Sequence, residues 1–119
     1  MTESELNKAI APASYALNIL AGKWNLKILA VLCSYKEIRY NELKRKVYGI
    51  TGTMLNQSLK DLIENGIVQR VQYNEVPSRV EYSLTGAGLE LIPIFEQLLL
   101  WGEKILRVVY LWYFFVLFY

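Results

Sequence analysis

Apolar residues recur along this 119-residue chain with helical spacing over most of its length. Pro12 is placed to open a first helix that ends near Gly22. The run from Trp24 to Cys33 (WNLKILAVLC) is apolar almost all round, which predicts a buried central helix. A short helix is predicted from Tyr40 to Val47, because its apolar residues at positions 43 and 47 stand four apart on one face. Residues 1–10 fit a frayed arm or the start of a helix equally well.

A further helix is predicted directly after a break at Gly49. Thr51 is placed to cap this helix, which runs to Glu64 and is closed by Asn65-Gly66. Its leucines at positions 55, 59 and 62 form one apolar stripe. At about 100° per residue, the opposite face carries mostly uncharged hydrogen-bonding side chains plus one lysine. That face contains Thr53, Gln57, Lys60 and Glu64, with Asn56 at its flank. An ordinary surface helix would carry more Glu and Lys there.

The region after this helix is rich in β-branched and aromatic residues. Ile67–Tyr73 and Arg79–Leu84 are predicted strands, joined by a tip at 74–78 that contains Pro77. Residues 34–38 are expected to be a polar connection. The order helix, turn, helix, hairpin predicts a winged helix-turn-helix: a mainly α fold with a small β-hairpin wing (α+β). Such a module places one helix in a DNA groove.

A last long helix is predicted after the hairpin. Thr85 is placed to cap it, although Gly86 and Gly88 weaken its first turn by up to about 1 kcal/mol each relative to Ala. Pro93 is expected to bend this helix or to mark a restart. The helix presents a broad apolar surface, more than so small a domain can cover alone.

The charge is small overall but unevenly distributed. The chain carries a net charge of +2. The stretch from Arg39 to Arg79 holds seven basic and four acidic residues, whereas residues 80–119 hold two basic and four acidic ones. A mildly basic middle and an acidic, apolar C-terminal part suggest that the two regions meet different partners.

The residue types present exclude several classes of catalytic and metal site. With no histidine and only one cysteine, Cys33, the chain cannot form a Ser-His-Asp triad, a Cys-His pair or a zinc site built from His or several Cys. We therefore expect no enzyme activity and no cofactor. A lone cysteine fits a reducing compartment, and the N-terminus lacks the pattern of a signal peptide, so we expect a cytoplasmic protein. Cys33 itself is interpreted as a buried, inert thiol rather than a sensor.

Several motifs in one order closely resemble the HxlR-type family of bacterial transcription regulators. They are GKW at 22–24, RYNELK at 39–44, GIT at 49–51, ENGIV at 64–68, VPSRVEYSLT at 76–85, Gly88, Pro93 and WGE at 101–103. The resemblance implies a dimeric winged-helix protein that binds double-stranded operator DNA, with the dimer interface built from the N-terminal and C-terminal helices. We interpret residues 1–119 as a single domain, with a family core at 12–104 and an apolar extension at 105–119.

Three positions depart from the family pattern. Members commonly carry a cysteine just before the N-terminal proline, used in some for redox sensing, and here that position is Ala11. Where many members have a basic or amide residue early in the recognition helix, this chain has Gly52-Thr53, so the operator sequence is expected to differ. The C-terminal sequence KILRVVYLWYFFVLFY is not a feature of the family.

The candidate DNA-binding residues divide by chemistry. Amide side chains pair with adenine and threonine contacts the thymine methyl, so Thr53, Asn56 and Gln57 are predicted to read bases. Lysines contact phosphates without carrying sequence information. Asn41 either contacts phosphate or supports the short helix, and Arg79 either enters a minor groove or pairs with a carboxylate that holds the wing in shape. The full predicted set is Arg39, Asn41, Lys44, Lys46, Thr51, Thr53, Asn56, Gln57, Lys60 and Arg79.

Two features of the chain remain open to alternative interpretations. The tail at 105–119 has one charge, Arg107, and at about 22 Å as a helix is too short for a membrane span. It is interpreted as an extension of the dimerisation helix, with a membrane-surface anchor or a peptide from an altered reading frame as alternatives. The alternative function is a protein–protein module, held at the membrane by this tail. Tyr15, Trp24 and Trp101 either line a pocket for a small-molecule effector or pack in the core.

Overall fold

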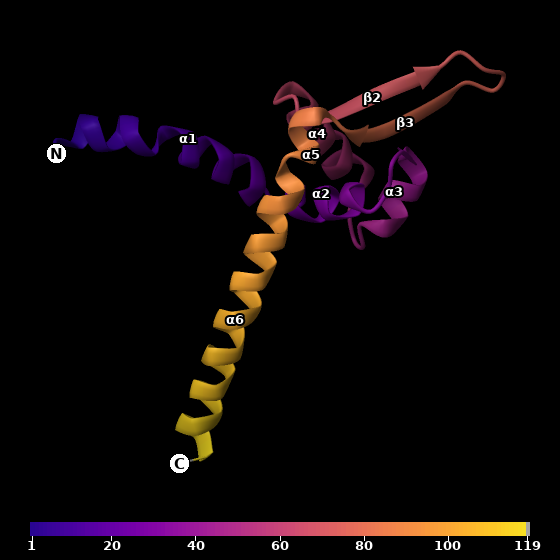
Figure 1. Ribbon diagram of the computed structural model, residues 1–119. Helices are drawn as coiled ribbons and strands as arrows, with labels where there is room; N and C mark the ends of the chain where they lie inside the picture. Colours follow the sequence, from indigo (N-terminus) through magenta and orange to yellow (C-terminus); the bar gives the residue numbers. More distant parts are fainter. Residues whose placement is uncertain (119) are drawn as a thin grey trace. The chain divides into compact units, whose positions relative to one another are not determined.

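The computed structural model describes residues 1–118 and shows a mainly helical chain with one small antiparallel sheet (Figure 1). Its elements are α1 (Glu3–Ala21), α2 (Asn25–Cys33), β1 (Ile38–Arg39), α3 (Tyr40–Lys46), α4 (Gly52–Glu64), β2 (Val68–Tyr73), β3 (Arg79–Leu84), α5 (Gly86–Leu89) and α6 (Leu91–Phe118). The chain divides into two compact units, residues 1–88 and the segment that begins at Leu89. Each is described by itself.

Helix α1 begins earlier than the sequence predicts. The Thr2 hydroxyl accepts a hydrogen bond from the Glu5 N–H, and the Glu5 carboxylate accepts one from the Thr2 N–H, both at 3.2 Å. This reciprocal capping box starts the helix at Glu3. Pro12 therefore lies inside α1, and the prediction that it opens the helix is wrong. The capping groups of residues 2–5 provide a complete N-terminus ahead of the proline.

Helix α2 is the buried central helix that its apolar run predicts. Ile28 and Leu29 are 0% exposed and Leu32 is 1% exposed. Asn25 is buried at the start of α2, where its side-chain amide donates to the Ile19 carbonyl at 2.8 Å and to the Asp61 carboxylate at 3.3 Å. One buried amide thus joins α1, α2 and α4, and it satisfies polar groups that would be costly to bury alone.

The helix-turn-helix consists of α3, a short turn and α4. Leu43 and Leu55 are both 0% exposed and anchor the two helices in the core. Gly49 in the turn has φ +83°, a conformation that glycine adopts without steric penalty. The Thr51 hydroxyl accepts the N–H of Met54 at 3.2 Å, so Thr51 is the N-cap that the sequence predicts.

The sheet has the order β1-β3-β2, with both pairs antiparallel. In the hairpin, Val68 lies opposite Leu84 and Tyr73 opposite Arg79, so the tip is the predicted 74–78 segment. Strand β1 is not predicted, because residues 34–38 read as a polar connection. It has only two residues and no alternating pattern of its own, and it forms where Ile38 and Arg39 pair with the free edge of β3.

The sequence predicts one long helix capped by Thr85 after the hairpin, but the structure, described to residue 118, has two helices there, the short α5 and the long α6. The Thr85 hydroxyl accepts the N–H of Gly88 at 3.1 Å and caps the short helix α5, not the long one. A separate helix, α6, starts at Leu91 with Pro93 in its first turn, so Pro93 marks a restart. The helix then continues without a break through the apolar extension to residue 118.

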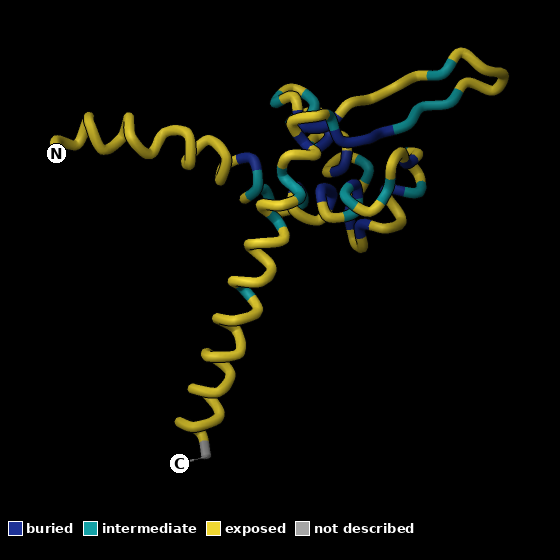
Figure 2. Tube along the Cα trace, in the orientation of Figure 1, coloured by how far each residue is buried: buried dark blue, intermediate teal, exposed yellow. Residues whose placement is uncertain are grey.

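Burial is concentrated in the winged-helix region. In Figure 2 the buried stretches, drawn dark blue, lie in and around α2, α3, α4 and the base of the hairpin, whereas α6 is exposed along most of its length. Among residues 1–118, none of the helices alone is both long and apolar enough to cross a membrane. Only α1 and α2 taken together, bent by 85° at their junction, reach that length and composition.

Candidate nucleic-acid interface

Helix α4 exposes the uncharged face that its sequence predicts. Leu55, Leu59 and Leu62 are buried on the inner side of the helix. On the other side, Thr53, Gln57 and Lys60 are exposed. Met54, which the sequence analysis leaves out, is 41% exposed beside Thr53. The outer surface of α4 therefore presents hydroxyl, amide and thioether groups with a single lysine, and the exposed carboxylate of Glu64 lies at its C-terminal end.

The amide of Asn56 is held in place by Tyr40, the first residue of α3. The Tyr40 hydroxyl donates a hydrogen bond to the Asn56 side-chain carbonyl at 2.7 Å. The hydroxyl oxygen also lies 3.4 Å from the carbonyl oxygen of Gly52. Tyr40 thus supports both the first turn of α4 and one of its exposed amides. In the sequence, Tyr40 is recognisable only as the start of a helix, and no spacing rule relates residue 40 to residue 56.

The predicted phosphate-binding lysines lie at different distances from α4. Lys44 reaches the N-terminus of α4, since its ammonium lies 3.9 Å from the place where a Cβ on Gly52 would stand. Lys46 lies over the ring of Tyr35, with its ammonium 5.4 Å from the ring centroid. A hydrogen bond with the Tyr35 hydroxyl raises the pKa of Lys46, so this side chain stays charged. Lys60 is exposed on α4 itself.

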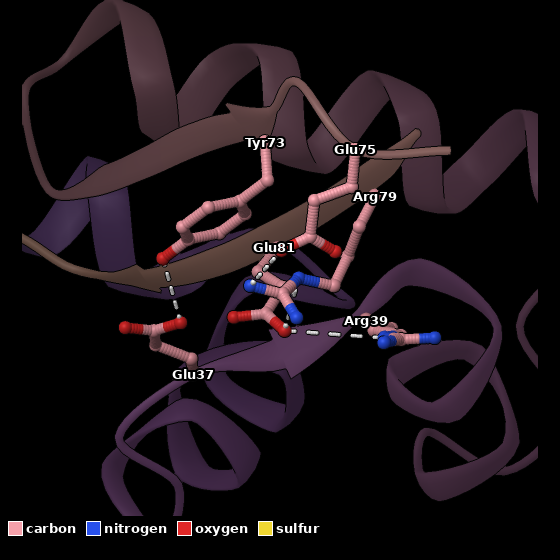
Figure 3. Close-up of polar contacts among 6 residues, drawn as sticks. All are labelled: Glu37, Arg39, Tyr73, Glu75, Arg79 and Glu81. Carbon is pink, nitrogen blue, oxygen red and sulfur yellow. Dashed lines mark hydrogen bonds and ion pairs between the residues drawn. The ribbon is translucent and has the colours of Figure 1, made fainter. Parts of the chain in front are cut away.

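Arg79 is held inside a network of charged and aromatic side chains at the wing (Figure 3). Its guanidinium lies 4.1 Å from the ring centroid of Tyr73. It forms ion pairs with Glu75 at 3.5 Å and with Glu81 at 3.3 Å. Glu81 also pairs with Arg39, its cross-strand neighbour, at 3.9 Å. Of the two interpretations of Arg79, the structure shows the carboxylate pairing that shapes the wing.

A second carboxylate connects the wing to the segment before β1. The Tyr73 hydroxyl donates to Glu37 at 3.0 Å. Hydrogen bonding from the Glu81 side chain, and next from Tyr73, lowers the pKa of Glu37. The same contact with Glu37 raises the pKa of Glu81, so a proton bound by this carboxyl pair resides on Glu81. The network contains both signs of charge and keeps the hairpin in register with β1.

A groove of about 500 Å³ lies between α3 and the wing. It brings together three predicted site residues, Arg39, Asn41 and Arg79. Glu42, Arg45 and Ser78 also line it and are absent from the predicted set, although Arg45 is one of the seven basic residues from Arg39 to Arg79. Three guanidinium groups and the carboxylate of Glu42 line this groove, and the guanidinium groups of Arg39 and Arg79 also pair with Glu81. The remaining predicted residues lie on α4, its N-cap and the outer side of α3.

The other residues singled out from the sequence have different surroundings. Cys33 is half-buried and not fully buried as predicted, and this partial burial raises the pKa of its thiol. Tyr15 is 57% exposed and donates a hydrogen bond to the Asn65 side chain at 2.8 Å. Trp24 is half-buried, and Trp101 on α6 is 64% exposed. None of these three aromatic side chains is fully buried in a core.

Comparison with known proteins assigns the fold and the regulator class. The family model "HxlR-like helix-turn-helix" matches residues 19–110. An HTH-type transcriptional regulator of Halalkalibacterium halodurans is 43% identical over 93 residues, which are 78% of this chain and 82% of that protein.

Solved structures of regulators share the same architecture. A MarR-family transcriptional regulator from Porphyromonas gingivalis is 42% identical with a TM-score of 0.69, over 78% of this chain and 90% of that one. The oxidised form of the redox regulator HypR is 39% identical with a TM-score of 0.69, over 78% and 95% of the two chains. The fold is a winged helix-turn-helix, and the chain belongs to the HxlR family of DNA-binding transcriptional regulators.

Proposed function

We propose that this chain acts in the cytoplasm as a homodimer that binds operator DNA, with α4 in the major groove and the wing on the flanking backbone. The observation that carries the proposal is the exposed face of α4, where Thr53 and Gln57 present uncharged hydrogen-bonding groups beside Lys60, and where the one carboxylate, that of Glu64, lies at the last residue of the helix. A groove-reading helix needs donors and acceptors directed at base edges, and acidic side chains there would repel the DNA.

Base reading is assigned to three residues. Gln57 and Asn56 present amides that pair with adenine, and Thr53 presents a methyl and a hydroxyl. The hydrogen bond from Tyr40 restrains Asn56 before DNA arrives, which lowers the conformational entropy lost on binding. Thr51 caps the N-terminus of α4 and so helps to fix the start of the reading helix.

Phosphate contacts are assigned to the basic groups around α4. Lys44 lies at the N-terminus of the helix, and Lys60 lies on its exposed face. On the wing side, the groove with Arg39, Asn41 and Arg79 faces the neighbouring backbone. Arg39 is the more available guanidinium, since its side chain is 64% exposed against 27% for Arg79. Arg79 acts mainly by holding the wing.

Dimerisation is assigned to α1 and α6, because each displays apolar side chains to solvent. On α1, Leu6 is 47% exposed and Leu17 is 62% exposed. On α6, Leu99 is 64% exposed. Apolar surface of this extent is typical of a protein–protein interface. A two-fold dimer would place its two α4 helices about 34–36 Å apart, or a multiple of this, and would bind a palindromic operator.

A gel-shift series with the DNA upstream of the chain's own gene tests the proposal. We expect binding by the dimer that weakens as salt rises and that prefers this DNA over a scrambled duplex of the same length and composition. Binding that ignores both salt and sequence would contradict a groove-reading role.

Two substitutions separate reading from positioning. Gln57→Ala should relax preference at one position of the operator by about 1–3 kcal/mol. Lys44→Ala should weaken all sequences alike and reduce the slope of log affinity against log salt by about one. Lys36→Ala, at an exposed position between α2 and β1, is the matched control and should change neither quantity. If Gln57→Ala and Lys44→Ala behave identically, the assignment of the reading face is wrong.

A further inference from the structure

Two lysines that lie outside the predicted site have their ammonium groups over the ring of one tryptophan, Trp24. The ammonium of Lys23 lies 5.2 Å from the centroid of the Trp24 ring, and that of Lys27 lies 4.9 Å from it. These distances are those of cation–π contacts, which restrain a flexible lysine while leaving its charge available. Both lysines are exposed. Among residues 1–118, no ion pair joins either of them to a carboxylate.

The same tryptophan lies against the turn of the helix-turn-helix. The Cη2 atom of Trp24 is 3.8 Å from the place where a Cβ on Gly49 would stand. Its neighbour Tyr48 is 86% exposed at the same turn. The turn that leads into α4 is therefore bordered by the two ammonium groups of Lys23 and Lys27 and by an exposed phenol.

We propose that Lys23, Lys27 and Tyr48 form a second phosphate-binding surface, which contacts the DNA strand at the edge of the groove that α4 enters. This inference rests on the proposed function. Gly49 precedes the first residue of α4 by three positions. When the N-terminal part of a recognition helix enters a major groove, the residues just before it are brought to the groove edge, where the phosphates lie.

The chemistry of this surface suits positioning rather than reading. Each ammonium is a compact charge that neutralises one phosphate and releases its counterions. The phenol of Tyr48 adds a neutral hydrogen-bond donor for a phosphate oxygen. Because every base pair carries the same phosphates, the surface adds affinity without sequence preference.

The test measures DNA affinity against salt for the full chain and for the double variant Lys23→Gln/Lys27→Gln. The probes are the upstream DNA and its scrambled counterpart. We expect the slope of log affinity against log salt to fall by about two in magnitude. When salt rises from about 50 to 200 mM, both proteins lose affinity for DNA. The factor by which the double variant weakens should be about ten times smaller than the factor for the unaltered chain. The preference for the upstream DNA should stay unchanged.

Three further variants sharpen the result. Lys36→Gln removes an exposed lysine between α2 and β1 and should leave the slope unchanged. Lys27→Arg keeps both the charge and the contact with Trp24 and should bind like the unaltered chain. Tyr48→Phe should weaken binding to both probes by a small, equal factor without altering the slope. Thermal unfolding of each variant checks that the fold is intact.

The possible failures are distinguishable. If the unaltered chain shows salt-sensitive binding and the double variant keeps its slope, the second surface is wrong while the proposed function stands. If the double variant loses affinity with no change of slope, the lysines have a structural role and the inference is also wrong. If the unaltered chain shows no salt-sensitive binding at all, both the proposed function and this inference fall.

Discussion

The winged-helix unit and the helix α6 use the same apolar residues in opposite ways. Leu29, Leu55 and Leu62 in the first unit are each 0% exposed, whereas Leu111 and Leu117 on α6 are 69% and 73% exposed. In helix α4 of the first unit the apolar positions form a stripe with polar residues on the other side, whereas helix α2 is apolar almost all round and packs at the centre of the same unit. Beyond residue 105 the helix is apolar almost all round. An all-round apolar helix is normally buried, as α2 is, so the exposed apolar side chains of α6 indicate a surface that another molecule covers.

The largest expected difference in the free energy of unfolding comes from changing one leucine to alanine in each of the two regions. Leu55→Ala should lower the free energy of unfolding by about 2–5 kcal/mol, because it leaves a cavity in a fully packed core. The loss should not depend on protein concentration. Leu111→Ala should cost less than about 0.5 kcal/mol at concentrations where the chain is monomeric. Urea denaturation at several protein concentrations measures both. An equal, concentration-independent loss for Leu111→Ala would show that the subunit itself covers this side chain.

Shortening the chain separates the two regions directly. A chain that ends at Lys104 lacks the apolar extension but keeps every buried residue of the first unit. Fully burying one large apolar side chain contributes about 1.5–3 kcal/mol, and each such residue occurs twice in a two-fold dimer. We therefore expect the dimer dissociation constant to rise at least about a hundredfold. Analytical ultracentrifugation measures this. Unchanged dimerisation would exclude the extension from the interface.

Gly88 tests how tightly the first unit is closed at its C-terminal end. A Cβ added there would clash with the Ile67 carbonyl oxygen and lie 3.1 Å from Leu84 side-chain atoms. Gly88→Ala should therefore destabilise the unit by about 1–3 kcal/mol, as other overpacking substitutions do. Gly86→Ala is the matched control, since nothing lies within 4 Å of its Cβ position. It should be neutral or stabilising by up to about 1 kcal/mol. Equal thermal shifts for the two variants would refute the packing role of Gly88.

The two glycines also show what sequence reasoning captures. Helical periodicity and capping residues correctly predict α2, α3, α4 and the hairpin, because these elements depend on contacts between near neighbours and on burial of one face. The clash at Gly88 depends on a carbonyl 21 positions earlier in the chain, and strand β1 depends on its pairing with β3. Neither leaves a local signal in the sequence.

The candidate site follows the same rule. The exposed face of α4 is predicted because it follows from one helix and its period. The support of Asn56 by Tyr40, the pairing of Arg79 with Glu81, and the groove that adds Arg45 and Ser78 all join separate elements. They require the tertiary structure. The resemblance to a family places the motifs in order, but it does not say which side chain a given arginine contacts.

The smallest expected effect is confined to the wing and should leave both the core and α6 unchanged. The contact with Glu37 raises the pKa of Glu81, while contacts with Glu81 and Tyr73 lower the pKa of Glu37. The contribution of Glu81 is therefore lost as pH rises through its raised pKa, and that of Glu37 is lost as pH falls through its lowered pKa. The wing network should be best ordered between these two pKa values.

Glu37→Gln tests this arrangement, because it removes the negative charge that faces Glu81 and leaves an amide that donates to it. The pKa of Glu81 should then fall toward or below its ordinary value, since both hydrogen bonding and Coulomb interaction with Glu37 raise it. NMR titration of the Glu81 side-chain carboxyl carbon measures the change. Glu64→Gln, at the exposed end of α4, is the control and should leave that titration unaltered. A Glu81 pKa that stays raised in Glu37→Gln would mean that burial alone sets it, and the wing would then have no carboxyl pair to respond to pH.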